Sequence, residues 1–266
     1  MIEKQDLYKR KFKLDVEQFK KWIIERSVGN YTKSFETHKR VQNIIACFMQ
    51  ETKKNKNVKV LDIGCGDGYH IFLLNTLKGI KEKVYFEGLD TSKLDIEFAR
   101  EVEESFGFDN IKFKLCDAES VEYPDNHFDI VLCSDVLEHL VRPEKCLSEI
   151  MRVLKLGGLA IITTPNKSNM VRIFRRKNIS SISNFKKKNV HISLKGLNEW
   201  LKIVRKTGFI VKGIKRGALI FGGNRYNSHP ILFAFIMIVD RILNILPFGK
   251  FFAEAFTLQL RKSKLG

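Results

Sequence analysis

The chain has 266 residues, of which 44% are hydrophobic, so it can bury the packed core of one generous domain with appendages. Its five cysteines are widely spaced without a C-x-x-C pair, which argues against a zinc ribbon or a disulfide framework and fits reduced thiols in a cytoplasm. The first 21 residues are densely charged, unlike a signal peptide. The longest apolar run, Ile231–Val239, is too short for the roughly 20 residues that span a bilayer.

The formal net charge of +17 is distributed unevenly. Residues 1–57 carry 14 basic and 7 acidic side chains, residues 58–165 carry 12 and 20, and residues 166–266 carry 21 and 3. An acidic middle suits a small cationic ligand, whereas basic ends suit phospholipid headgroups, a phosphorylated carrier or nucleic acid. A lysine-rich solvated surface would give the same count, so charge alone names no partner.

Hydrophobic periodicity predicts an alternation of helices and strands. Two amphipathic helices are expected within residues 1–57, the second carrying Val41, Ile44 and Phe48. Short apolar strands then alternate with helices, and the last of these helices begins at Pro143 and ends at Gly157 and Gly158. The strands are expected at 58–63, 83–89, 111–115, 128–133 and 159–163, and the other helices at 66–77 and 93–106, the latter capped by Ser92. This order predicts an α/β fold with a doubly wound parallel sheet.

The regular alternation of strands and helices ends after Pro165. Residues 166–189 contain eight Lys or Arg and no acid; a helix at 194–206 and a strand from Phe209 follow. An apolar segment, Pro230–Leu246, then precedes a last strand at 255–260. We therefore expect four parts: an N-terminal helical cap at 1–57, a core at 58–165, a basic amphipathic insertion at 166–190, and the rest of the core at 191–266 with an apolar helical insertion at 229–247.

The most informative segment is V-L-D-I-G-C-G-D-G-Y, residues 60–69, where a buried strand ends in Asp62 and three glycines follow at alternate positions. Glycine allows the chain to turn tightly and a ligand to lie directly on the backbone. A dinucleotide-binding G-x-G-x-x-G loop would need its third glycine where Tyr69 stands. Because turns also use glycine, the loop taken alone is consistent with either a ligand site or a plain turn.

Acidic residues also follow the next two strands. In open α/β sheets, ligands bind beyond the carboxyl ends of the strands. Asp90 lies where a carboxylate can accept hydrogen bonds from ribose hydroxyls, and Asp117 where one can accept from an adenine amino group. A single acid at a strand end is more often a turn former or a helix cap. Several acidic residues at the ends of neighbouring strands, together with the glycine loop, favour a ligand site.

Three further segments follow in order: Y-P-D-N-H-F-D-I-V-L-C-S-D-V-L-E-H-L at 123–140, R-V-L-K-L-G-G at 152–158 and H-I-S-L-K-G-L with G-F-I-V at 191–211. With the glycine loop they resemble the class I S-adenosylmethionine-dependent methyltransferases of the UbiE/UbiG-like, methyltransferase type 11 kind, although Leu156 replaces the proline of the family's R-V-L-K-P-G-G turn. The resemblance implies a Rossmann-like sheet of seven strands, mostly parallel with the last antiparallel. It implies S-adenosylmethionine as cofactor, bound by Asp62, Gly64, Cys65, Gly66, Gly68, Asp90, Thr91, Asp117, Ala118 and Ser134.

His139 is the candidate catalytic base, because an imidazole can remove a proton from an attacking hydroxyl. A helix-surface histidine with a structural hydrogen bond is the competing interpretation. If residues 135–139 are helical, Asp135, Glu138 and His139 project from one face and could bind a divalent cation. D-x-x-E-H resembles the metal-binding stretch of the ubiquinone-pathway O-methyltransferases, and also the E-x-x-E-H of the small-RNA 3′-end methyltransferases, which have a later histidine where His191 stands here. These resemblances imply Mg²⁺ or Mn²⁺, with His191 as a further ligand. The same E-H pair also occurs in methyltransferases for which no metal is implied.

The two insertions bear on the acceptor. The basic one could lie in an anionic membrane interface, and the apolar one could cover a greasy acceptor, although a solvated loop and a core or dimer helix are the plainer interpretations. We expect a cytoplasmic methyltransferase, peripheral on the inner face of a membrane, acting on an oxygen of a small or lipid-linked acceptor. An RNA or glycan methyltransferase is the alternative enzyme; nucleic acid is less expected because no RNA-binding module is apparent. A non-catalytic scaffold that keeps the cofactor fold is the alternative of another class.

Overall fold

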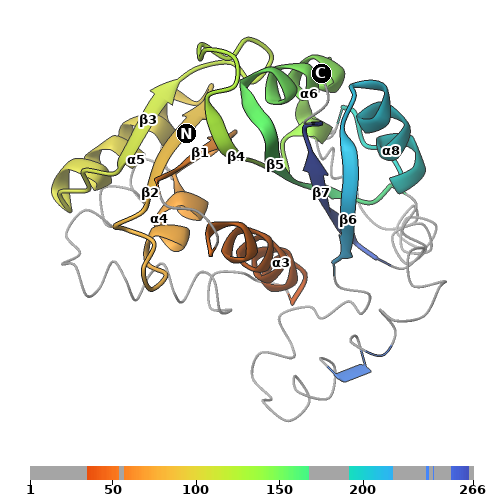
Figure 1. Cartoon of the computed structure of the whole chain (residues 1–266), viewed down its shortest axis with the longest axis horizontal. Coiled ribbons are helices and arrows are strands. Elements are labelled where there is room, and N and C mark those ends of the chain that lie inside the picture. The colour runs from red at the N-terminus through yellow and green to blue at the C-terminus, as the bar shows by residue number, and fades with distance from the viewer. Residues whose placement is uncertain are drawn as a thin grey trace, which may run out of the picture.

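A computed structural model describes residues 35–53, 57–167, 192–217, 238–239, 242 and 253–263. These residues form a seven-stranded sheet with the order β3-β2-β1-β4-β5-β7-β6, with helices on both sides (Figure 1). The first five strands pair in parallel, and β7 is antiparallel to both β5 and β6. The predicted Rossmann-like architecture with an antiparallel last strand is confirmed.

The strands have the predicted order along the chain. They are β1 (Val58–Ile63), β2 (Val84–Asp90), β3 (Ile111–Leu115), β4 (Phe128–Ser134), β5 (Leu154–Pro165), β6 (Ile210–Arg216) and β7 (Ala255–Arg261). The helices are α3 (Phe35–Thr52), α4 (Tyr69–Asn75), α5 (Lys93–Ser105), α6 (Pro143–Val153) and α8 (Leu197–Lys206), with a short 3₁₀ helix η1 (Leu137–His139). The hydroxyl of Ser92 accepts the Asp95 N–H at 3.4 Å, as expected for the N-cap of α5.

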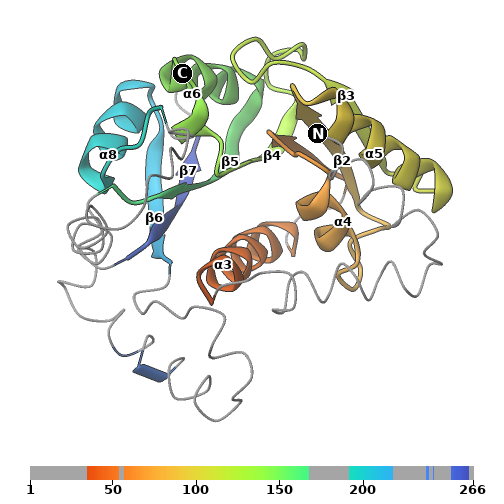
Figure 2. The same cartoon turned by 180° about the vertical axis from the view of Figure 1, so that it is seen from behind.

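The sheet separates two apolar layers, because side chains alternate between its faces. On one face, α3, α4 and α5 pack against the strands through residues such as Phe48, Phe72 and Phe98. On the other face, α6 and α8 contribute Leu147, Ile150 and Trp200. Figures 1 and 2 show these two groups of helices on opposite sides of the sheet. Both faces are therefore covered, and the carboxyl ends of the parallel strands remain for a ligand.

The junction of α6 and β5 differs from the prediction. Gly157 and Gly158 were expected to end the helix, but α6 already ends at Val153 and β5 begins at Leu154. The pairing of β5 with β4 then jumps from Leu154 to Leu159, and Gly157 within the jump has φ +76°. The glycines therefore form an irregularity inside the strand, where a positive φ costs glycine little.

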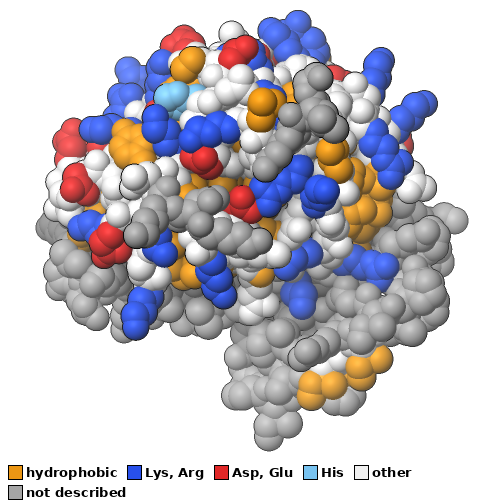
Figure 3. Space-filling model, in the orientation of Figure 1, with side chains coloured by type: hydrophobic (Ala, Val, Ile, Leu, Met, Phe, Trp, Pro, Cys, Tyr) orange, Lys and Arg blue, Asp and Glu red, His pale blue; other side chains and the backbone are white. Residues whose placement is uncertain are grey.

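Several predictions concern residues outside the described ranges. These are the first helix of the N-terminal cap, the basic insertion from residue 168 onward, His191 and most of the apolar insertion at 229–247. Within the latter, the two exposed side chains that are described are Ile238 and Ile242. Among the helices that the structure describes, none combines the length and the apolar character needed to cross a bilayer. Figure 3 shows Lys and Arg side chains spread over one described face together with Asp and Glu.

Candidate functional site

The glycine loop after β1 turns through three left-handed residues. Gly64, Gly66 and Gly68 have φ values of +72°, +54° and +78°. The Gly64 N–H donates to the Leu89 carbonyl at 2.8 Å, which ties the loop to the end of β2. A Cβ on Gly64 would lie 2.3 Å from Cγ2 of Val136, and one on Gly68 would lie 2.7 Å from the Phe113 ring. Protein packing therefore explains the first and third glycines.

Gly66 is different, because a Cβ added there would meet no atom of the described protein within 4 Å. Its surroundings do not require a glycine, although its φ of +54° favours one. Open space above a left-handed backbone is what a ligand resting directly on the chain needs. Gly66 therefore leaves room for a ligand on the backbone, next to Asp90, whose Oδ2 accepts the Gly66 N–H.

Asp90 is held rigidly at the end of β2. Its Oδ2 accepts the Gly66 N–H at 2.9 Å and its Oδ1 accepts the Ser92 N–H at 2.8 Å. Each carboxylate oxygen can accept a second hydrogen bond. The two backbone donors thus orient the carboxylate while leaving it able to accept from the hydroxyls of a ribose.

Asp62 lies deeper than predicted. It is 1% exposed, and neither of its carboxylate oxygens has a hydrogen-bond donor among the described residues. Nδ1 of His70 lies 4.0 Å from its Oδ2. Burial raises the pKa of the Asp62 carboxyl to about 7, and the charge of Asp90 adds to the rise. Asp62 therefore lies in the protein interior next to the loop, where burial favours the neutral form of its carboxyl.

A cavity of about 300 Å³ opens at the carboxyl ends of the strands. It brings together seven of the residues predicted for the site, from four separate segments of the chain. The seven are Gly64, Asp90, Thr91, Asp117, Ala118, Asp135 and His139. Three further residues that were not predicted for the site also line the cavity: Cys116, Val136 and Leu140. These last three are sequence neighbours of Asp117, Asp135 and His139. Cys65, Gly66, Gly68, Ser134 and Asp62 are not on its wall.

The segment from Asp135 to His139 is not the α-helix on which the metal prediction depended. Asp135 has a left-handed φ of +56°, and only Leu137–His139 form a single 3₁₀ turn. Nη1 of Arg40, on α3, contacts both carboxylate oxygens of Asp135 at 3.0 and 2.9 Å, and the hydroxyl of Thr163 donates to one of them at 3.2 Å. The helical spacing on which the metal site depended is therefore absent, and the Asp135 carboxylate is paired with Arg40, although Asp135 and His139 both line the cavity.

The side chains next to Asp135 also diverge from a shared metal site. Glu138 is 1% exposed, whereas His139 is 37% exposed and lines the cavity, with its Nε2 3.9 Å from Oε1 of Glu138. Among the described residues, no group of three or more His, Cys, Asp or Glu side chains could hold a metal ion. His191, the other predicted ligand, lies outside those residues. The prediction of Mg²⁺ or Mn²⁺ is thus unsupported in the described part of the chain.

The fold and the cavity define the class of protein: a Rossmann-like domain with a glycine loop after β1 and with Asp90 and Asp117, at the carboxyl ends of β2 and β3, in one cavity. The chain belongs to the S-adenosylmethionine-dependent methyltransferases, since the family model described as a methyltransferase domain matches residues 54–208. This family implies S-adenosylmethionine as the cofactor.

Individual relatives agree with this assignment. The chain is 33% identical over 100 residues to an uncharacterized methyltransferase, YcgJ, of Bacillus subtilis, which is 38% of each chain. It is 25% identical over 242 residues to the ubiquinone biosynthesis O-methyltransferase of Rickettsia prowazekii, covering 88% of this chain and 92% of that protein. The solved structure of the [4+2]-cyclase SpnF has the same fold, with a TM-score of 0.59 at 20% identity over 85% of this chain and 81% of that one. The chain thus spans about two fifths of the first of these relatives.

Proposed function

We propose that this protein transfers a methyl group from S-adenosylmethionine to an oxygen of a small or lipid-linked acceptor. The observation that carries the proposal is the shared cavity, which is lined by Asp90, Asp117 and His139. S-adenosylmethionine, when bound, supplies an electrophilic methyl group on a sulfonium centre. The residues of this chain have to hold the cofactor, exclude competing water and accept the proton that a hydroxyl acceptor loses.

Cofactor binding falls to the loop and to the strand-end acids. Gly66 leaves open backbone, the oriented carboxylate of Asp90 suits two ribose hydroxyls, and Asp117 with Ala118 suits an adenine edge. The Asp90 carboxylate lies against the loop, where its charge favours a cationic ligand over an anionic one. This is the charge complement of a sulfonium.

Proton removal falls to His139. Its ring is partly exposed in the cavity wall, and Glu138 lies beside its Nε2 from the buried side. An imidazole in this position can take up the proton that a hydroxyl loses as its oxygen attacks the methyl group. An imidazole in contact with the cavity and backed by a buried acid favours an acceptor that must be deprotonated, such as a hydroxyl.

Exposed apolar side chains near the cavity support an acceptor with a greasy part. Leu140 lines the cavity, and Val141, the next residue, is 74% exposed. Ile192 is 65% exposed and precedes Ser193, whose hydroxyl donates to the Leu140 carbonyl at 2.7 Å. The similarity to a ubiquinone biosynthesis O-methyltransferase points in the same direction. The eight basic residues between 166 and 189 would then favour an acceptor held at an anionic membrane surface.

The acceptor class can be tested by incubating the protein with S-adenosylmethionine labelled in its methyl group and, separately, with lipid extract, glycan and RNA. We expect label in the lipid fraction, in a bond with the stability of an ether. Label in RNA or glycan would contradict the acceptor that we propose while leaving methyl transfer intact. Cosedimentation with anionic vesicles, lost when the six basic residues at 172, 175, 176 and 186–188 are changed to Gln, would support a membrane surface.

The role of His139 has its own test. His139→Asn should lower kcat by about 10²–10⁴-fold, the usual contribution of a general base, and leave the Kd for S-adenosylmethionine nearly unchanged. His127→Asn is a suitable control because His127 directly precedes β4, at the amino-terminal end of the strand, whereas the cavity lies at the carboxyl ends of the strands. An unchanged kcat for the His139 variant would show that the acceptor needs no base.

A further inference from the structure

The connection between β3 and β4 has an unusual construction. The two strands run parallel to β2 and β1, which lie between them in the sheet, so the chain must cross over these two strands. Residues 116–127 make this crossover without a helix or strand. They also begin with Cys116, Asp117 and Ala118, which line the cavity. The crossover therefore both carries part of the site and lacks regular hydrogen bonds of its own.

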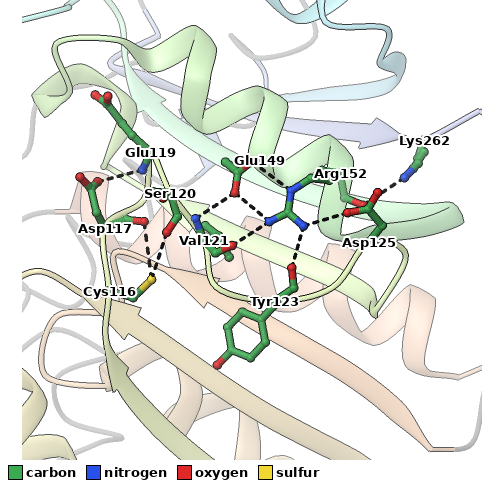
Figure 4. A network of polar contacts seen from close by, with 10 residues as sticks. All are labelled: Cys116, Asp117, Glu119, Ser120, Val121, Tyr123, Asp125, Glu149, Arg152 and Lys262. Carbon is green, nitrogen blue, oxygen red and sulfur yellow. Dashed lines mark hydrogen bonds and ion pairs between the residues drawn. The ribbon is translucent and has the colours of Figure 1, made fainter.

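Side chains of α6 supply those hydrogen bonds instead (Figure 4). Arg152 donates from Nη2 to the Val121 carbonyl at 2.7 Å and from Nη1 to the Tyr123 carbonyl at 2.6 Å. Nη1 also donates to Oδ1 of Asp125 at 2.9 Å. Glu149 accepts the Val121 N–H at 2.9 Å. Buried backbone groups must find partners, and here one arginine and one glutamate provide them.

The guanidinium of Arg152 is fully used. Its remaining two N–H groups, on Nε and Nη2, donate to the two carboxylate oxygens of Glu149 at 3.0 and 2.8 Å. With the three bonds to the crossover, all five donors of the side chain have acceptors. A lysine has three donors on one atom and cannot reproduce this planar fork. These contacts raise the pKa of Arg152, chiefly through the hydrogen bonds to Glu149.

The restraint extends from Val121 to the wall of the cavity through short contacts. The Ser120 N–H donates to the Asp117 carbonyl at 3.1 Å, and the Glu119 N–H donates to Oδ1 of Asp117 at 2.8 Å. The thiol of Cys116 donates to the Ser120 carbonyl at 3.5 Å. Residues 116–121 thus form one tight turn, in which Val121 is the point held by α6 and Asp117 is the part that faces the cavity.

We infer that Arg152 is a positioning residue for the cofactor: it fixes the irregular crossover and thereby the place of Asp117 and Ala118 in the cavity wall. This inference rests on the proposed function, because it assigns that wall to S-adenosylmethionine. Arg152 does not line the cavity, so its effect on binding is transmitted through the turn at 116–121. It acts on the cofactor side of the site and not on the acceptor side, where His139 lies.

The test is Arg152→Lys in the full chain, with the Kd for S-adenosylmethionine measured by calorimetry well below the melting temperature. We expect the Kd to rise by about tenfold, the factor that corresponds to one good hydrogen bond lost at the wall. In turnover assays, KM for the cofactor should rise more than KM for the acceptor. A purely structural role would lower the melting temperature and leave both constants unchanged.

Arg261→Lys is the matched control. Arg261 pairs with both carboxylate oxygens of Glu51 and donates to the Gly157 carbonyl at 2.9 Å, but none of these residues lines the cavity. Both variants should lose stability, and only the Arg152 variant should lose cofactor affinity. If Arg152→Lys does not fold, Glu149→Gln tests the same restraint through the Val121 N–H, with a smaller expected rise in Kd.

A double-mutant cycle locates the effect. If Arg152 acts through Asp117, then Arg152→Lys should have little further effect on Kd in an Asp117→Ala background, because coupled residues are not additive. Additive effects, or a Kd within about twofold of wild type for both Arg152→Lys and Glu149→Gln, would overturn the inference. Absence of binding by the wild-type protein would instead overturn the proposed function on which it rests.

Discussion

The most discriminating substitution in the site is Gly66→Ala. Gly66 has φ +54°, and a methyl group placed there would meet no described atom within 4 Å. The cost to the folded protein is therefore only that of a left-handed alanine, about 1–2 kcal/mol. In a protein of this size, that loss lowers the melting temperature by roughly 2–8 °C. The same methyl group would occupy the open space that we assign to the cofactor, so affinity should fall far more than stability.

Gly107→Ala provides a closely matched control. Gly107 has φ +60°, and a methyl group added there would likewise meet no atom within 4 Å, but its N–H donates to the Glu104 carbonyl in α5, whereas the Gly66 N–H donates to Asp90 in the cavity wall. Thermal melts and calorimetric titrations of the two variants should give similar losses of stability. The Kd for S-adenosylmethionine should rise about tenfold or more in Gly66→Ala, as expected for overpacking, and stay at the wild-type value in Gly107→Ala. Equal affinities in both variants would refute a cofactor lying on Gly66.

Three further substitutions test separate parts of the site. Asp90→Ala should raise the Kd for the cofactor more than about tenfold, because a charged hydrogen-bond acceptor is lost. Asp129→Ala, at the amino-terminal end of β4, should leave this Kd unchanged. Equal Kd values for the two variants would remove Asp90 from the site. Arg40→Met should lower kcat more than cofactor affinity, because the turn at Asp135, which precedes His139, loses its two hydrogen bonds from Arg40. Steady-state kinetics would measure this fall in kcat, and an unchanged kcat would contradict the prediction. The pKa of Asp62 in the folded protein is about 7, above its ordinary value of 3.8. Between about pH 4 and 7 the folded protein therefore keeps a proton on Asp62 that the unfolded chain has lost. Its free energy of unfolding falls as the pH rises through this range, by at most about 1.4 kcal/mol per pH unit. Denaturant titrations of Asp62→Asn should lack that component, and a pH profile parallel to wild type would count against it.

Much of the fold follows from local sequence pattern. Short apolar strands alternating with amphipathic helices predicted the parallel part of the sheet, and the rule that ligands bind at the carboxyl ends of strands predicted that Asp90, Asp117 and His139 share one cavity. These predictions succeed because period and strand order are properties of neighbouring residues. The prediction of the α6–β5 junction failed because glycines occur in β-bulges as well as at the ends of helices.

The parts of the site that the sequence did not predict depend on long-range contacts. Arg40 and Asp135 are 95 residues apart and meet only once α3 has packed on the sheet. Asp135 adopts its left-handed backbone beside that contact, and this breaks the helical spacing on which the metal prediction relied. The role of Arg152 is similar, because its acceptors are backbone carbonyls whose position no side-chain pattern encodes.

The central claim is that the cavity between the glycine loop and His139 binds S-adenosylmethionine as a methyl donor. Calorimetric titration of the wild-type protein with S-adenosylmethionine tests it most directly. We expect saturable binding with one site per chain, competed by S-adenosylhomocysteine and weakened by Gly66→Ala but not by Gly107→Ala. No detectable binding, or binding that is indifferent to Gly66, would contradict it.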